Sequence, residues 1–356
     1  MSSPTAHDRK FSFFGLKENP FKVSPDLRFL FATPAHEKAF FGLLYRVQAR
    51  QGLMVLTGEP GVGKTTLLCR LLGMLGSYRI STSCVFHPRL DAVDLFRFIL
   101  EDFGVPCGSH GKGNVLRALH SWLLQRYKAG DTPVVIIDDA QALPVDTLDE
   151  LRLLLNVESA TGKFLQIILA GQPELEETFL QPKLYPLRQC VMYRCHLPQL
   201  TLEQTSAYIQ TRLSIADLVD YELFPGETVE EIYLHSKGIP RTVNLLCEQA
   251  IMNACSEQKE SISPEDILRV ARDFSFVARS PSLGQGNKPS AEKKPVHTSA
   301  FVSRRRNRSA FFERYLTDVR TSFRRDAHTF VSQCASFLRA PMTKTVRSPK
   351  RSGSHV

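Results

Sequence analysis

The chain has 356 residues and a net charge of +9, and its 43% apolar and 23% charged content is ordinary for a soluble globular protein of one or two domains. No run approaches the roughly 18 apolar residues of a membrane-spanning helix, and the first residues lack an apolar stretch of signal-peptide length, so we expect a cytoplasmic protein without a transmembrane span. The eight cysteines form no Cys-x-x-Cys pair, which favours a reducing compartment without zinc or disulfides.

Strands and helices alternate through residues 1–198. A short apolar run at 53–57 precedes a Gly-rich turn, and leucines at helical spacing follow it. We expect further strands at 78–86, 133–138, 164–171 and 190–197, and helices over 91–104, 114–130, 146–158 and from Glu174. Because the strands are continuous apolar runs, the pattern predicts a three-layer α/β sandwich on a parallel sheet.

Residues 199–275 have the pattern of a small all-helical domain that follows the sheet. A capping box at Thr201 opens its first helix. The segment Gly238–Pro240 breaks the next stretch into two helices, and Ser263 followed by proline opens the last one.

The excess of positive charge lies near the end of the chain. Residues 301–356 hold thirteen Lys and Arg against three Asp and Glu, so the first 300 residues are close to neutral. Residues 276–310 are rich in Ser, Pro, Gly, Lys and Arg and predict a disordered linker. Aromatic residues then recur at helical steps opposite arginines, which favours a basic amphipathic tail over 311–356. A solvated disordered extension is the alternative.

The segment "LTGEPGVGKTTLL" is a P-loop in its required context, after a strand and before a helix. The glycines let the backbone N–H groups face phosphate oxygens, and the following helix adds its positive end. The lysine reaches the terminal phosphates and the first threonine supplies a hydroxyl to Mg²⁺. The predicted nucleotide-binding residues are Gly58, Glu59, Pro60, Gly61, Val62, Gly63, Lys64, Thr65 and Thr66.

Two adjacent acids follow the apolar strand in "VVIIDDAQAL". Asp138 is expected at the end of that strand, where parallel α/β sheets bind ligands, so we predict that it holds Mg²⁺ together with Thr65. Successive strand residues face opposite sides, so Asp139 is expected to have a different role. We predict that Asp139 activates the attacking water; the alternative is that it caps the next turn or meets a basic neighbour.

The ligand is expected to be ATP with Mg²⁺. The Asn-Lys-x-Asp segment that accompanies guanine specificity is absent, and so is the "LSGGQ" signature of transporter-type ATPases. Adenine is favoured by this elimination.

With these motifs, the chain resembles AAA+ ATPases, and more closely the general secretion pathway protein A group of ExeA-like secretion ATPases. The resemblance covers about residues 12–273. The segments that carry it are "FFGLKENPF", "SPDLRFLF", "GEPGVGKTT", "VVIIDDAQAL", "LQIILAGQPEL", "YPLRQ" and "GIPRTVNLLCEQA".

The resemblance implies roles for residues outside the P-loop. The segment Asn19, Pro20 and Phe21 is expected to lie against the adenine. Gln172 is expected to sense the γ-phosphate at the end of the fourth strand. Two arginines complete the set by supplying positive charge where phosphoryl transfer develops negative charge. Arg188 resembles an arginine finger that acts on a neighbouring subunit, and Arg241 resembles the arginine of the helical lid that contacts the nucleotide.

Three departures from the family pattern bear on function. The family usually has Glu where Asp139 stands, and it usually has a second arginine where Cys190 stands, which leaves Arg188 and the more distant Arg194 as candidate fingers. The secretion proteins also continue into a membrane span and a cell-wall-binding domain, and this sequence shows neither.

The function expected from the sequence is that of an oligomeric ATPase. It hydrolyses ATP with Mg²⁺ and, as a homo-oligomer or ring, remodels or gates a secretion or envelope assembly at the cytoplasmic face of the membrane. The basic tail is expected to meet anionic lipid or DNA. Two alternatives stay open: a DNA-associated ATPase of the transposition type, and an ATP-binding switch that does not hydrolyse.

Overall fold

The computed structural model describes seven segments of the chain. Statements below about what is present or absent refer to these segments. The expected linker over 276–310 and the basic tail over 311–356 lie outside them. The described residues are 11–22, 26–76, 78–86, 88–106, 111–160, 162–218 and 222–274.

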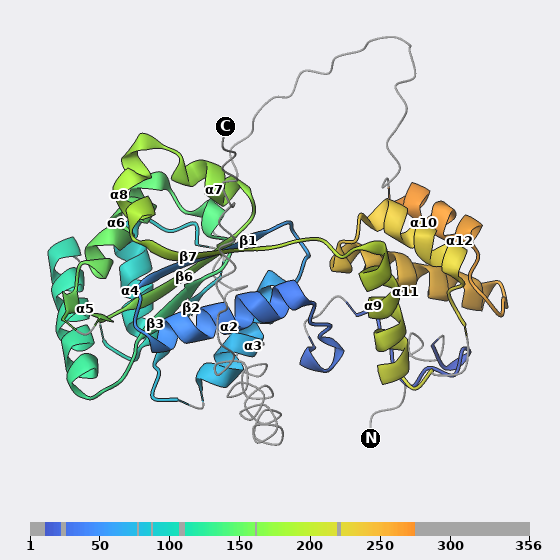
Figure 1. The fold of residues 1–356 in the computed structure, drawn as a ribbon, viewed down its shortest axis with the longest axis horizontal. Helices are drawn as coiled ribbons and strands as arrows, with labels where there is room; N and C mark the ends of the chain where they lie inside the picture. Colours follow the sequence, from blue (N-terminus) through green and yellow to red (C-terminus); the bar gives the residue numbers. More distant parts are fainter. Residues whose placement is uncertain are drawn as a thin grey trace, which may run out of the picture.

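A five-stranded parallel sheet lies at the centre of the lobe that contains α2–α8 (Figure 1), with strand order β2-β3-β6-β1-β7. Every residue of β1, β3 and β6 is buried, as their unbroken apolar sequences require. All neighbouring pairs are parallel, so the carboxyl ends of the strands meet at one edge. The strands are β1 (Leu53–Gly58), β2 (Thr82–Val85), β3 (Val134–Ile137), β6 (Gln166–Gly171) and β7 (Val191–Leu197).

Helices cover both faces of this sheet and confirm the predicted three layers. On one face, α2 (Pro34–Gln48) and α3 (Lys64–Leu75) share a hydrophobic cluster with β1 residues Met54 and Leu56. On the other face, α4, α5 and α6 pack on Leu53 and Val55 of the same strand. The helices of this second face are α4 (Ala92–Asp102), α5 (Lys112–Lys128) and α6 (Val145–Leu155).

Several short elements complete this layer structure. They comprise α7 (Glu174–Phe179), α8 (Tyr185–Gln189), the antiparallel pair β4 (Glu158–Ser159) and β5 (Gly162–Lys163), and the 3₁₀ turns η1 (Leu27–Phe29), η2 (Ala140–Ala142) and η3 (Pro182–Leu184). The sequence pattern did not predict the hairpin or α2. Helix α2 nevertheless has ordinary start signals, because Thr33 accepts a hydrogen bond from the backbone N–H of His36 and proline occupies its first position.

Four helices after the sheet form a bundle of their own, as the sequence predicts (Figure 1). The predicted capping box at Thr201 is present, and Ser263, predicted as a cap, forms a second capping box with Asp266. Among the described residues, no helix is long and apolar enough to cross a bilayer. The bundle helices are α9 (Leu202–Ile215), α10 (Gly226–Ser236), α11 (Pro240–Ser256) and α12 (Pro264–Asp273).

The N-terminal segment packs with this bundle, which differs from the expected division at residue 198. Phe11, Phe14, Leu16 and Phe21 belong to the same buried cluster as the apolar faces of α9–α12. The ring of Phe21 meets that of Phe224 edge to face at 6.0 Å between centroids. Burial of apolar surface favours this position of the N-terminal segment, because the bundle shields these four large side chains from water.

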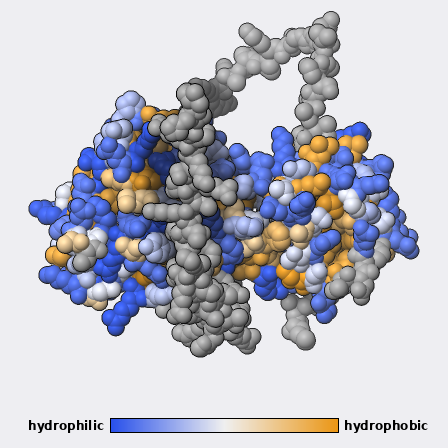
Figure 2. All heavy atoms as spheres, in the orientation of Figure 1, coloured by the Kyte–Doolittle hydropathy of each residue, from blue (hydrophilic) through white to orange (hydrophobic). Residues whose placement is uncertain are grey.

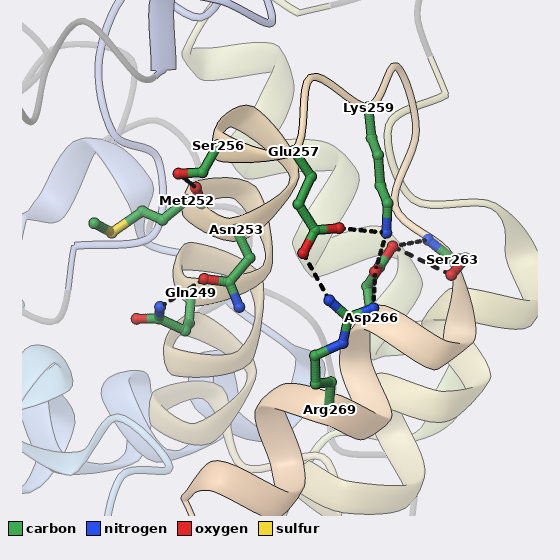
Figure 3. A network of polar contacts seen from close by, with 9 residues as sticks. All are labelled: Gln249, Met252, Asn253, Ser256, Glu257, Lys259, Ser263, Asp266 and Arg269. Carbon is green, nitrogen blue, oxygen red and sulfur yellow. Dashed lines mark hydrogen bonds and ion pairs between the residues drawn. The ribbon is translucent and has the colours of Figure 1, made fainter.

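A polar network fixes α12 against the end of α11 (Figure 3). Lys259 lies between Glu257 and Asp266, with donor–acceptor distances of 2.8 and 2.5 Å, and Arg269 donates to Glu257 at 2.6 Å. Asp266 also accepts hydrogen bonds from Ser263. On the face shown in Figure 2, hydrophobic residues gather over the bundle, while the sheet domain is largely hydrophilic.

One glycine joins the bundle to the end of the sheet domain. Gly238, between α10 and α11, accepts a hydrogen bond from the backbone N–H of Leu200 at 2.9 Å. Its φ is +69°, and a Cβ at this position would lie 2.0 Å from the carbonyl oxygen of Leu200. The approach of the two backbones therefore requires glycine.

We predict that Gly238→Ala lowers the free energy of unfolding by about 2 kcal/mol or more, because it adds a left-handed backbone cost and a backbone clash. Gly226→Ala is the control, since a Cβ there meets open space. It is expected to leave stability unchanged or up to about 1 kcal/mol higher. Denaturant unfolding of both variants measures the difference; equal stabilities contradict the packing described here.

Candidate functional site

The P-loop lies between β1 and α3 at the carboxyl edge of the sheet. Gly61 and Gly63 have φ of +89° and +104°, conformations that other residues rarely adopt. Val62 between them is buried in the core, whereas Glu59 is partly exposed and Pro60 exposed. The loop is thus anchored by one apolar side chain while its backbone curls at the start of α3.

Lys64, the first residue of α3, is almost fully buried. Its Nζ donates to the carbonyl oxygens of Gly58 at 2.7 Å and Glu59 at 3.0 Å. Burial lowers the pKa of the lysine, and the nearby carboxylates of Asp138 and Asp139 oppose that shift. The ammonium is therefore held over its own loop, close to both acids.

Thr65 and Asp138 come together as the sequence predicts. The Thr65 hydroxyl donates to Oδ2 of Asp138 at 2.6 Å, and the other carboxylate oxygen accepts from the backbone N–H of Asp139 at 3.0 Å. Burial raises the pKa of Asp138, against the effect of the Thr65 hydrogen bond. The Thr65 hydroxyl and the Asp138 carboxylate are oxygen ligands of the kind that Mg²⁺ prefers. Phosphate and water would supply the remaining ligands of the ion.

The backbone at Asp139 differs from the prediction. Strand β3 ends at Ile137, so both acids lie in the turn that follows it and strand alternation does not separate them. Asp139 instead adopts a left-handed conformation, with φ 54° and ψ 38°. This turn, rather than the pleat of a strand, gives the two neighbouring carboxylates their different directions. The Asp139 side chain makes no capping hydrogen bond to η2.

Gln141 connects Asp139 with Gln172, a link that no sequence motif indicated. Nε2 of Gln141 donates to Oδ1 of Asp139 at 3.3 Å, and its Oε1 accepts from the backbone N–H of Gln172 at 3.1 Å. Gln172 follows β6, which lies between β1 and β3 in the sheet. The structure therefore brings the predicted sensor strand and the second acid together through one amide.

Arg241 lies against the P-loop from the helical bundle. Its backbone N–H donates to the carbonyl oxygen of Gly61 at 3.3 Å. A Cβ added at Gly61 would meet the Cβ of Arg241 at 2.7 Å. The start of α11 is thus in contact with the loop, and the Arg241 residue is exposed there.

His36 is a second site residue that sequence reasoning missed, since a lone histidine forms no motif. Its Nε2 lies 3.2 Å from the carbonyl oxygen of Val62, and its Nδ1 lies 2.7 Å from the Thr33 hydroxyl. Burial lowers the pKa of His36, so the neutral imidazole is favoured and joins α2 to the P-loop.

Asn19, Pro20 and Phe21 face the helical bundle through their side chains and backbone. The Asn19 amide donates to Glu248 at 2.6 Å, and the Pro20 carbonyl oxygen accepts from Arg212 at 2.5 Å. Phe21 is completely buried, so its ring has no face exposed to a base. The bundle therefore holds this segment in place, and its expected position against the adenine stays a prediction.

Arg188 lies apart from the P-loop residues, on the short helix α8. It is exposed, and no described carboxylate forms an ion pair with it. Arg194 is engaged within the chain, because it pairs with Glu176 and lies 5.3 Å from the ring centre of Phe179. Of the two candidate fingers, Arg188 is the one whose charge faces outward.

Sequence comparisons agree with this geometry. Residues 47–179 match the family model described as AAA domain. General secretion pathway protein A from Aeromonas hydrophila is 35% identical over 266 residues, which cover 74% of this chain and 48% of that protein. The chain spans about half the length of this curated relative.

Solved structures share the fold at low sequence identity. CDC6P from Pyrobaculum aerophilum has a TM-score of 0.55 at 17% identity, over 74% of this chain and 70% of that chain. The ORC2 protein of Aeropyrum pernix, described as ADPNP-ADP complexes, has a TM-score of 0.52 at 16% identity, over 72% and 71%. At these identities the likeness establishes the fold alone.

The parallel sheet, the P-loop and the acids at its carboxyl edge define a P-loop protein of the AAA class. Residues 47–179 match the AAA domain model, and the chain resembles General secretion pathway protein A in sequence. The resemblance first drawn from short motifs is confirmed.

We predict that Asp138→Asn becomes more stable relative to the parent as the pH rises from about 4 to 7. Below the ordinary carboxyl pKa near 3.9, folded and unfolded chains both carry the proton, so burial of Asp138 costs no charge. As the pH rises through the raised pKa, the folded parent must bury a carboxylate and loses stability, whereas asparagine stays neutral.

Denaturant unfolding across this pH range, without nucleotide or metal, measures the effect. Asp273→Asn is the control, because it makes the same substitution at an exposed site on α12. A difference between Asp138→Asn and its parent that stays constant with pH rules out a burial cost at Asp138.

Proposed function

We propose that this chain is an ATPase that binds ATP with Mg²⁺ at the P-loop and hydrolyses it. The observation that carries this proposal is the convergence of Lys64, Thr65, Asp138 and Asp139 at the carboxyl edge of one sheet. The fold it shares with a protein described with ADPNP and ADP supports an adenine nucleotide as the ligand.

Each residue has a part that suits its surroundings. The amides of residues 58–66 and the ammonium of Lys64 bind the phosphates, and Thr65 with Asp138 holds Mg²⁺, which neutralises phosphate charge when bound. Asp139 accepts a proton from the attacking water or orients it. Gln172 contacts the γ-phosphate region. Arg241 contacts the nucleotide from the helical bundle, which already touches the loop at Gly61.

Self-association completes the proposed site. The exposed guanidinium of Arg188 lies on the outer helix α8, where it is available to a second copy of the chain. A homo-oligomer, such as a ring, then brings Arg188 to a neighbour's nucleotide. The name of the curated relative supports a secretion assembly as the partner. An envelope assembly, and a position of the ATPase on the cytoplasmic side, are further parts of this proposal.

A DNA-associated ATPase is the second candidate function. The thirteen Lys and Arg within residues 301–356 favour contact with an anionic polymer or surface. Salt-sensitive retention of the full chain on DNA, without binding to anionic liposomes, supports this candidate. The reverse result supports a membrane-facing secretion role.

We predict that Lys64→Ala lowers ATP turnover at least about a hundredfold and weakens nucleotide binding, because it removes the point charge at the terminal phosphates. Phosphate release at saturating Mg²⁺ and ATP measures turnover. Lys38→Ala, an exposed lysine on α2, is the matched control and is expected to act like the parent. Turnover that survives in folded Lys64→Ala contradicts the proposed ATPase site.

We predict that Arg188→Ala keeps nucleotide affinity but loses about 10³-fold in turnover, the effect of removing an arginine finger. If the finger acts between subunits, parent turnover per chain rises with protein concentration. A mixture of Arg188→Ala with Lys64→Ala then recovers part of the activity, since each variant supplies what the other lacks.

The control for this experiment is Arg272→Ala, an exposed arginine at the end of α12. It is expected to retain parent turnover and its dependence on concentration. Turnover that is independent of concentration, with no recovery in the mixture, argues against a finger in trans.

A further inference from the structure

One side chain contacts both the second acid and the end of β6. The Oε1 atom of Gln141 accepts from the backbone N–H of Gln172 at 3.1 Å, and its Nε2 donates to Oδ1 of Asp139 at 3.3 Å. The orientation of the amide is fixed by its partners, because a backbone N–H only donates and a carboxylate only accepts. Gln141 is therefore bound at both ends.

The surroundings of Gln141 hold this amide in place. A Cβ added at Gly171 would lie 2.8 Å from Oε1 of Gln141, so the absence of a side chain on β6 makes room for it. The 3₁₀ turn η2 fixes its backbone through the hydrogen bond from Ala142 N–H to the Asp139 carbonyl oxygen at 2.9 Å. Ala140, beside it, is completely buried.

This contact contributes to the direction of the Asp139 side chain. Its backbone is left-handed, so no strand pleat orients the side chain. Gln141 is neutral, so its hydrogen bond adds no positive charge beside the carboxylate to that of the nearby Lys64. A base held by an amide keeps its capacity to accept a proton.

We propose that Gln141 is a positioning residue for hydrolysis, which holds the Asp139 carboxylate and couples its position to the end of β6 at Gln172. This proposal rests on the proposed ATPase function. A displacement of the Gln172 backbone, such as one that follows contact with a γ-phosphate, then moves the amide and with it the acid.

Two substitutions separate the contacts of Gln141. Gln141→Leu removes both hydrogen bonds at similar volume. Gln141→Glu keeps an acceptor for the Gln172 N–H but places a carboxylate against Asp139. Both variants are expected to lower turnover about tenfold or more with nucleotide affinity unchanged, as one lost hydrogen bond to a charged group predicts. Gln210→Leu, an exposed glutamine on α9, is the control and retains parent turnover.

A double-mutant cycle with Asp139→Asn distinguishes positioning from general damage. If Gln141 acts through Asp139, Gln141→Leu changes turnover less than about twofold once Asp139 is already asparagine. A loss in Gln141→Leu that is equal in both backgrounds overturns the proposal, and so does parent-like turnover in Gln141→Leu.

Hydrogen exchange tests the contact without reference to activity. The Gln172 amide is expected to exchange faster in Gln141→Leu and at the parent rate in Gln141→Glu, because only the first variant lacks its acceptor. If the parent shows no Lys64-dependent turnover, the proposed ATPase function fails. In that case hydrogen exchange still tests the hydrogen bond between Gln172 and Gln141. If the Gln172 amide is as protected in Gln141→Leu as in the parent, this hydrogen bond is absent and the proposal is overturned.

Discussion

The hydrogen bond from Thr65 Oγ1 to Asp138 Oδ2 joins the P-loop helix to the turn after β3 that carries the acids, at 2.6 Å. The carboxylate of Asp138 is almost completely buried, and burial raises its pKa, so this site is costly to charge. A divalent cation on the same oxygens offsets that cost, because it adds positive charge to that of the nearby Lys64. In the proposed function, the electrostatic cost of the buried acid thus favours binding of the metal–nucleotide complex.

The helical bundle reaches this site through backbone contacts rather than ion pairs. The turn before α11 contacts Leu200 at Gly238, and Arg241 at the start of α11 contacts the P-loop at Gly61, each by a main-chain hydrogen bond. The N-terminal segment is buried in the same bundle through Phe21 and is tied to it by Asn19 and Glu248. A displacement of the bundle would therefore carry the N-terminal segment and the start of α11 together, and change the contact of α11 with the P-loop.

Local signals in the sequence predicted the parallel sheet, the bundle and the P-loop, because apolar runs, caps and glycines act within a few residues. They also placed Thr65 beside Asp138. They did not predict that the N-terminal segment packs with α9–α12, because this packing depends on an apolar surface formed by residues far along the chain. The roles of His36 and Gln141 were missed for a related reason: each acts through contacts with segments far along the chain, and neither residue type forms a motif.

Asp139 shows how a short side chain is adapted to its position. It stands where the resembling family usually has Glu, and its carboxylate is closer to the backbone by about 1.5 Å, one carbon–carbon bond. The left-handed turn and the amide of Gln141 together decide where those oxygens point. With a shorter reach, a given shift of the backbone takes the acid out of hydrogen-bond range of its water sooner than it would a Glu. Turnover in the proposed reaction is thus sensitive to the end of β6, which gives a partner that acts on this edge of the sheet a means to control the rate.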